Sequence, residues 1–246
     1  MTEKDIGLEL NPPKRANRRV KSVVSPSAND GAAMLNGYAS SGGYYAQMFN
    51  ADAIIKNEND LIRRYRELAQ RAEVESAIED VVTEAIVYDG NTFPCSINLD
   101  DVALTAAVKK KIEEEFEEVL HLYNAENLDE IFRTWYIDGR IHYYVIIDPD
   151  RITDGIVELR YIDPRKIKKV KDVKKIRTES GLDVIDSVDE YYLFNDNGIE
   201  ANTLSGVRLT MDSVIYAHSG IYDSGTNVIL SYLHKAIRPA NQLKMM

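Results

Sequence analysis

The sequence has very little of what marks disulfide-rich, zinc-binding and membrane-spanning proteins. Its 246 residues include one cysteine, Cys95, and four scattered histidines. A single cysteine excludes an intrachain disulfide, and this composition provides no cluster of zinc ligands. No apolar run approaches the roughly 20 residues that a membrane-spanning helix needs, and no signal peptide opens the chain. We therefore expect a globular chain without a membrane span or a metal site.

The motifs of common enzyme classes are also missing. His218, Ser219 and Asp223 lie close together, but catalytic triads come from separate elements and the usual G-x-S-x-G elbow is absent. The aspartates within residues 148–154 do not form a calcium loop, because its glycine and its final glutamate are not in place. There is no P-loop and no dinucleotide fingerprint. We predict no enzyme, with no catalytic, cofactor-binding or metal-ligating residues.

Positive charge is the minority sign. Lysine and arginine number 30 against 40 acidic residues, a net charge of −10. Proteins that grip nucleic acid need cations to displace counterions, so any contact with DNA would have to be local. One candidate is the first segment, residues 1–50, which is low in periodicity and is predicted to be a disordered tail. Residues 10–29 hold five cations and no anions, so this tail would suit DNA, an acidic partner surface, or solvent alone.

Helical periodicity begins near residue 59. Apolar residues recur at helical spacing over residues 61–72 and then, in shifted phase, over residues 74–86, which predicts two helices with a corner near Arg71. Two further helices are predicted over residues 104–123 and 128–136, and Gly139 closes the second of them.

Strand patterns follow the helices. Residues 140–148 and 156–163 are rich in β-branched and aromatic side chains, and residues 213–219 form a further candidate strand. Asp196, Asn197 and Gly198 predict a tight hairpin between residues 190–195 and 199–204. Helices first, an antiparallel sheet second and a last helix from about Asn227 indicate the α+β class. We expect one domain over residues 51–226.

The last predicted helix, residues 227–246, ends without a stop signal. Its apolar pattern runs through Leu243 to Met245 and Met246, with no glycine or asparagine after it. We expect the natural chain to continue beyond this point.

A basic run begins at Arg165 and ends at Arg177, with eight cations against the single Asp172. One interpretation is an exposed edge strand that lysines protect from aggregation. The other is a contact with an anion or with nucleic acid, carried by Lys166, Lys168, Lys169, Lys171, Lys174 and Lys175. Its apolar residues fall at every third position, a spacing that does not distinguish a helix from a strand.

Four collinear segments resemble the portal protein of contractile-tailed bacteriophages. These are "RTWYIDGRIHYYVIIDP" (133–149), "LRYIDPRKI" (159–167), and the stretches 61–89 and 214–244. The resemblance covers the chain from about residue 59 to its end, and it identifies the chain as the N-terminal wing portion of that family. The matching motif residues, expected to be mostly structural, are Trp135, Tyr136, Asp138, Arg140, Asp163, Pro164, Arg165, His218 and Pro239.

The resemblance implies a structural virion protein. Such a subunit belongs to a ring, usually of twelve copies, that is assembled in the host cytoplasm and set at one capsid vertex, where double-stranded DNA passes through. Its implied partners are its own copies, the major capsid protein, the terminase packaging motor and neck proteins. Twelve copies at −10 each sum to −120 (12 × −10), a charge that repels phosphate. The alternative is a DNA-binding module that uses the basic tail and the basic run.

Overall fold

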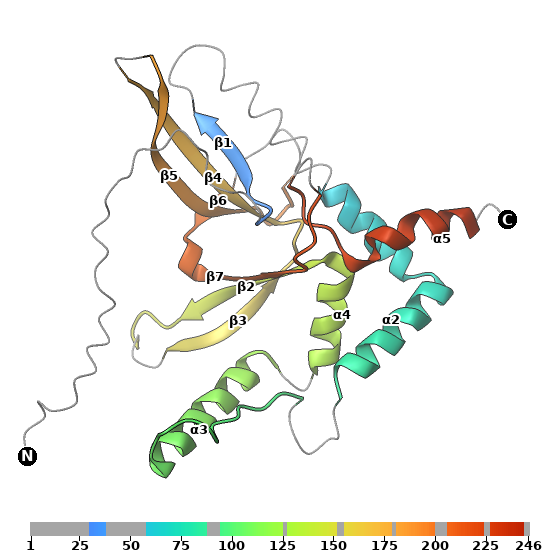
Figure 1. Ribbon diagram of the computed structural model, residues 1–246, viewed down its shortest axis with the longest axis vertical. Coiled ribbons are helices and arrows are strands. Elements are labelled where there is room, and N and C mark those ends of the chain that lie inside the picture. The colour runs from blue at the N-terminus through green and yellow to red at the C-terminus, as the bar shows by residue number, and fades with distance from the viewer. Residues whose placement is uncertain are drawn as a thin grey trace, which may run out of the picture.

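The structure, a computed structural model, describes residues 30–37, 58–87, 94–124, 127–151, 155–178, 181–199, 206–223 and 227–243. After one N-terminal strand come the helices, then the other strands of two small sheets, and a short helix ends the described chain, so the predicted α+β class is confirmed (Figure 1). No helix in these ranges is both long enough and apolar enough to cross a membrane.

The first helices form one layer. A helix over residues 58–69 is followed by α2 (Ala72–Ala85), and the chain turns between them at Arg71, as predicted. These helices bury their apolar stripes against α4 (Leu128–Asp138) and the end of the chain. The buried members of this core are Tyr65, Leu68, Ala69, Ile78, Val82, Ile137 and Leu233. Apolar burial of this kind, more than helix propensity, stabilises such short helices.

Helix α3 (Ala106–Leu122) is less well covered. It lies below β3 in Figure 1, apart from α2. Its end is anchored by the buried Leu120 and by Tyr123, whose ring meets Tyr143 edge to face at 5.5 Å. Val108 and Val119 are each 45% exposed, so the apolar stripe of α3 is only partly buried within the described residues.

Gly139 ends α4 as predicted and directs the chain into the sheet. Its φ of 71° lies in the left-handed region, and its amide donates to the carbonyl of Trp135 at 2.8 Å. A Cβ at this position would come within 2.8 Å of the Leu230 carbonyl oxygen and of Ser231 Cα. Only glycine fits this conformation and this close approach.

Three strands form the first sheet, in the order β3-β2-β7. Strand β2 (Arg140–Ile147) is central and pairs antiparallel with β3 (Ile156–Ile162) and β7 (Val214–His218). These elements match the predicted strands closely. The register places His142 opposite Ile162 on one side and Tyr216 on the other.

Four strands form the second sheet, in the order β1-β4-β5-β6. Strand β4 (Ile167–Arg177) pairs antiparallel with β5 (Asp183–Phe194), and β5 pairs antiparallel with β6 (Val207–Leu209). Strand β1 (Ala33–Gly37) runs parallel to β4, with Ala33 opposite Val170. Where the two sheets face each other, Ile162, Ile167, Tyr192 and Val214 form a second core.

Three predictions need correction. The single antiparallel sheet is two sheets, one of which contains a parallel pair, because β1 comes from far upstream. That strand lies inside the segment expected to be a tail; residues 1–29 and 38–50 of the segment are outside the described residues. The turn at residues 196–198 is present, with Gly198 donating to the Asn195 carbonyl at 3.0 Å, but the next strand to pair with β5 is β6.

The last helix begins later than predicted. Asn227 has a positive φ of 57°, and Ile229 forms an isolated bridge with Tyr222, so the chain is extended here. A short 3-10 helix, η4 (Tyr232–Ala236), then leads into α5 (Ile237–Leu243). A second 3-10 turn, η3 (Met211–Ser213), precedes β7. Val228 and Ile229 are buried, but they lie in an extended segment. The sequence analysis counted their apolar side chains as part of a helical pattern, so it placed the start of the helix too early.

Candidate functional site

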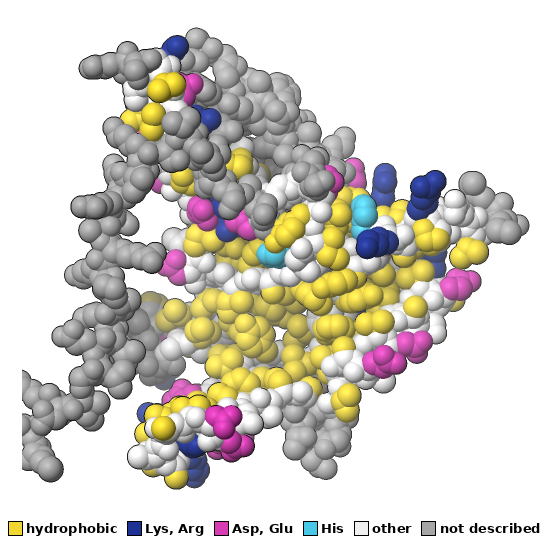
Figure 2. All heavy atoms as spheres, viewed as in Figure 1, with side chains coloured by type: hydrophobic (Ala, Val, Ile, Leu, Met, Phe, Trp, Pro, Cys, Tyr) yellow, Lys and Arg dark blue, Asp and Glu magenta, His cyan; other side chains and the backbone are white. Residues whose placement is uncertain are grey.

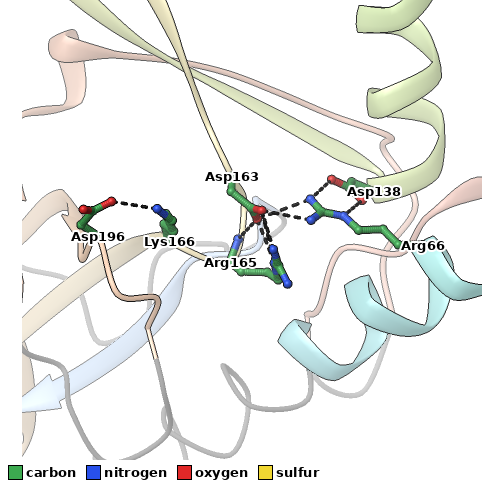
Figure 3. A network of polar contacts seen from close by, with 6 residues as sticks. All are labelled: Arg66, Asp138, Asp163, Arg165, Lys166 and Asp196. Atoms are coloured by element: carbon green, nitrogen blue, oxygen red, sulfur yellow. Dashed lines mark hydrogen bonds and ion pairs between the residues drawn. The ribbon is translucent and has the colours of Figure 1, made fainter.

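Polar side chains from three elements meet at Arg66, in the helix over residues 58–69. Its guanidinium donates to both carboxylate oxygens of Asp138, at 2.9 and 2.6 Å, and to Asp163 Oδ2 at 3.0 Å. Figure 3 shows the guanidinium lying between the two carboxylates. Asp138 ends α4 and Asp163 follows β3, so one arginine joins a helix end, a strand end and the first helix. We call Arg66, Asp138, Asp163 and Arg165 the Arg66 network.

Asp163 organises the turn that leads into β4. Its Oδ1 accepts from the Arg165 amide at 2.9 Å, and its Oδ2 accepts from Arg165 Nη2 at 2.8 Å. Pro164 lies in this turn and is buried. Burial alone would raise the pKa of Asp163, but hydrogen bonds from Arg165 and Arg66 outweigh it and hold the pKa well below its usual range.

A second cluster lies deeper in the protein. Glu58 accepts from Arg140 Nη1 at 3.1 Å and from Lys168 Nζ, and Arg140 Nη2 donates to the Ile229 carbonyl at 2.5 Å. Glu58, Arg140 and Lys168 are only 3%, 5% and 6% exposed. We call these three residues the Glu58 cluster. It connects the first helix, β2 of one sheet and β4 of the other.

His142 lies close to this cluster and is buried. Its ring stacks on Tyr216 with centroids 4.6 Å apart. Within the described residues, His142 Nδ1 and Arg140 Nε have no hydrogen-bond partner. Burial, together with the positive charges of Arg140 and Lys168, lowers the pKa of His142 to about 3. The imidazole is therefore neutral in the folded protein at physiological pH.

A third cluster fastens β1 to the sheet. The Asp30 carboxylate lies 2.6 Å from Lys169 Nζ and 2.9 Å from Lys171 Nζ. Glu190 on β5 lies 3.4 and 3.5 Å from the same two ammonium groups. Burial acts to raise the pKa of Asp30, but the two lysines outweigh it and lower the pKa. This pairing explains how a short strand from the N-terminal segment is held.

The basic run forms β4, and the edge-strand interpretation is wrong, because β4 lies between β1 and β5. Carboxylates of the chain itself lie against most of its lysines. Besides those already described, Lys166 lies 2.7 Å from Asp196, and Lys174 lies 2.8 Å from Asp189. Lys175 is partly buried. A strand whose lysines are held internally is a weak candidate for an anion-binding surface.

Three further motif residues lie in or beside helices α4 and α5. Trp135 and Tyr136 lie against Tyr232, the Tyr136 ring stacking on it at 5.1 Å and 3°. Pro239 lies in the first turn of α5, where a missing amide costs least.

The residues that resembled a triad form a turn instead. His218 Nδ1 accepts from the Gly220 amide at 3.1 Å. Ser219 Oγ donates to the Leu230 carbonyl at 2.6 Å and accepts from the Ile221 amide at 3.2 Å. In the described part of the chain, no group of three His, Cys, Asp or Glu side chains is placed to hold a metal ion.

Comparison with known proteins identifies the family of this chain. A sequence model of the family described as "Bacteriophage T4-like portal protein (Gp20)" matches residues 58–246. The chain belongs to the T4-like portal protein family. The match begins at Glu58, the residue that joins the two sheets, and includes the whole Arg66 network.

Two portal proteins show the relationship in detail. The portal protein of Vibrio phage KVP40 is 35% identical over 198 residues, which cover 76% of this chain and 38% of the relative. The portal protein of Salmonella phage ViI is 30% identical over 237 residues, covering 90% of this chain and 41% of the relative. The chain thus spans about two fifths of the length of these relatives.

Portal proteins are structural components of the virion and are not enzymes. In the described part of the chain most buried charged side chains bind one another. The Arg66 network and the Glu58 cluster can fix the relative positions of helices and sheets. The turn at Ser219 is engaged in local hydrogen bonds that shape the backbone.

The sequence identified one partner of most of these ion pairs. Asp138, Arg140, Asp163 and the lysines were singled out as motif or candidate contact residues, and the structure places most of them in the Arg66 network, the Glu58 cluster and the cluster at Asp30. Their partners Asp30, Glu58 and Arg66 were missed, because each is distant in sequence and sits in an ordinary helical or loop pattern. One signal for these partners was available in the sequence. The basic run has many lysines and no regular alternation of polar and apolar residues, and lysines that become buried need carboxylates from other parts of the chain.

Proposed function

We propose that this chain is the wing portion of a portal subunit, residues 51–226 forming the wing domain and residues 227–246 leading towards the stem. About twelve copies form a ring at one capsid vertex, through which double-stranded DNA is packaged and ejected. The family match over residues 58–246 carries this proposal. Both relatives described above are named portal proteins.

The internal ion pairs support a structural role. Arg66 joins three elements with bidentate geometry, and the Glu58 cluster joins both sheets across a buried space. Charge-assisted, bidentate hydrogen bonds of this kind fix geometry more strictly than apolar contacts do. A subunit that keeps its shape while DNA moves past needs such internal connections.

The charge distribution supports passage of DNA without tight binding. The net charge is −10, and most lysines of β4 face carboxylates of the same chain. A negative surface repels phosphate, so DNA would slide. These pairs count against the alternative of a DNA-binding module built on the basic run.

The docking partners follow from the same proposal. The ring would contact the major capsid protein on its outside, the terminase motor during packaging, and neck proteins afterwards. The wing residues would supply part of the surface for the capsid.

Electron microscopy of the complete gene product, under conditions where circular dichroism shows it folded, tests the proposal. We expect ring-shaped particles with about twelve subunits. A folded product that stays monomeric at micromolar concentration would contradict it. A steep, salt-dependent affinity for DNA that disappears on deleting residues 1–50 would instead favour the DNA-binding module.

A further inference from the structure

Helix α3 buries only one edge of its apolar stripe. Within this helix Leu120 alone is buried, and Ile112 and Phe116 are half-buried. Val108 and Val119 are eleven positions apart (119 − 108), about three helical turns, so their side chains point in nearly the same direction. Each is 45% exposed. This margin of the stripe is open to solvent, and we call Val108 and Val119 the free edge of α3.

The charges of α3 are separated along its length. Three lysines, residues 109–111, lie in its first two turns, and its second half carries five glutamates and no lysine or arginine. Side chains three or four positions apart are neighbours on a helix surface. Lys111 therefore lies beside Val108, and Glu115 lies beside Val119. The free edge of α3 is bordered by positive charge at its start and by negative charge at its end.

A second partly uncovered surface consists of aromatic side chains. Phe132, Trp135 and Tyr136 of α4 lie together with Tyr232 of η4, with neighbouring ring centroids between 5.1 and 6.1 Å apart. Tyr232 is 38% exposed, and the other three side chains are half-buried. We call these four residues the aromatic row. Tyrosine and tryptophan that are partly exposed in this way are enriched where proteins bind one another.

The aromatic row points away from α3. The cleft between α4 and the end of α3 is lined by Thr134, Ile137 and Asp138 of α4. With 3.6 residues per turn, these three lie on the opposite side of the helix from Phe132 and Tyr136. Figure 1 shows α4 standing between α3 and α2. Helix α3 and the aromatic row are therefore on different sides of α4, and a closed ring needs two different surfaces of each subunit that fit each other.

Charges of opposite sign flank the aromatic row. Lys235 and Arg238, both exposed, follow Tyr232, and η4 and α5 contain no acidic residue. On the other flank, α2 carries five acidic residues and no lysine or arginine, and it is joined to α4 by Glu75, 3.4 Å from Arg133. Figure 2 shows Lys and Arg side chains around α5 and Asp and Glu side chains along α2, with hydrophobic side chains between them.

We propose that in the assembled ring α3 of one copy docks on the aromatic row of the next copy. Val108 and Val119 pack against the aromatic rings, the glutamates of α3 face Lys235 and Arg238, and its lysines face α2. The two surfaces match in apolar character and in the order of their charges, so one orientation of the helix is favoured over the reverse. This inference rests on the proposed ring and identifies the surfaces that join its subunits.

Carbodiimide coupling of the complete gene product tests this contact. The reagent joins a lysine to a carboxylate directly, so it reports only pairs that touch. Rings assembled from isotope-labelled and unlabelled copies should give linked peptides with one labelled and one unlabelled partner. In these peptides the glutamates of α3 should be joined to Lys235, and its lysines to the carboxylates of α2. Lys174 and Asp189, 2.8 Å apart in one chain, are the internal control and should couple only within a chain.

Charge reversal provides a second test of the same contact. Lys235→Glu with Arg238→Glu should lower the yield of labelled–unlabelled peptides at α3 by about tenfold, because like charges then face each other. Adding Glu115→Lys and Glu118→Lys to that chain should restore the yield, since the signs are exchanged on both surfaces.

The matched control is Lys166→Glu with Arg208→Glu, the same change of charge on β4, β5 and β6, and it should leave the yield at the wild-type value. The inference is overturned if intact rings couple α3 only within its own chain or to α3 of another copy. Equal yields in wild type and in Lys235→Glu with Arg238→Glu overturn it as well. Electron microscopy scores the rings before coupling, so a lack of rings is recognised separately, as a failure of the proposed function and of this inference with it.

Discussion

At the scale of single residues, His142 is a neutral imidazole held among buried cations. Its pKa falls from the ordinary 6.5 to about 3 because of burial and of Arg140 and Lys168. Below pH 6.5 the unfolded chain takes up a proton at this residue and the folded chain does not. Its contribution to stability is therefore complete above pH 6.5 and is lost progressively as the pH falls towards 3.

We predict that His142→Gln removes part of the pH dependence of folding. Between pH 7 and pH 5 the wild-type free energy of unfolding should fall by about 2 kcal/mol more than that of the variant, at about 1.4 kcal/mol per pH unit below 6.5. Urea unfolding at the two pH values measures this. His121→Gln, a change at an exposed histidine of α3, is the control and should keep the wild-type slope. Equal slopes in wild type and His142→Gln would show that His142 is protonated in the folded state.

Residue types in the sequence indicated which polar groups matter, but not how they pair. Asp138 and Arg140 stood out beside Gly139, yet their partners Arg66 and Glu58 lie 72 and 82 positions away in sequence. Helical periodicity marks which face of a helix is apolar, and it says little about which charged neighbour is buried. Burial of charge depends on the tertiary arrangement, so these pairs needed the structure.

At the scale of elements, the junction between α4 and β2 depends on one glycine. We predict that Gly139→Ala destabilises the protein by about 3 kcal/mol, from left-handed backbone strain plus overlap with the backbone of Leu230 and Ser231. Thermal or urea unfolding measures the loss.

The matched control for this change is Gly155→Ala. Gly155 has a similar φ of 79°, but none of the residues that the structure describes has an atom within 4 Å of its would-be Cβ. It should therefore cost only the backbone strain, about 1 kcal/mol. Equal losses at the two glycines would mean that the contact at Gly139 contributes nothing.

Local elements were predictable where the period was strong. The helices near Leu68 and Ile78, the Gly139 stop and strand β2 all lie where the sequence placed them. Strand β1 was missed, because its five residues lie in a segment of low complexity and pair with β4 some 137 positions later, Ala33 opposite Val170 (170 − 33). Parallel pairing across such a distance leaves no local pattern.

At the scale of the whole molecule, the Glu58 cluster joins the helical layer to both sheets. We predict that Glu58→Gln lowers the free energy of unfolding by about 3 to 5 kcal/mol, because it leaves Arg140 and Lys168 buried without their carboxylate. The fluorescence of Trp135, the single tryptophan, follows the helices, and far-ultraviolet circular dichroism follows all elements. In wild type both signals should report one urea midpoint.

The control for Glu58→Gln is Asp189→Asn, which removes the carboxylate of an ion pair 57% exposed on both sides. Exposed pairs contribute little, so its midpoint should stay at the wild-type value. A Glu58→Gln protein as stable as Asp189→Asn would show that the buried cluster does not hold the two sheets together.

Strand β1 lies outside the stretch that matches the portal family, which starts at residue 58. A gene trimmed to that boundary would encode β4 without its β1 partner, which would leave the backbone of residues 170–174 unpaired on that side. Lys169 and Lys171 would also lose Asp30. The shortened protein would expose unpaired N–H and C=O groups along β4, which can pair with other chains, so we expect it to precipitate during expression. Recombinant versions of this protein should therefore retain the residues from Asp30 onward.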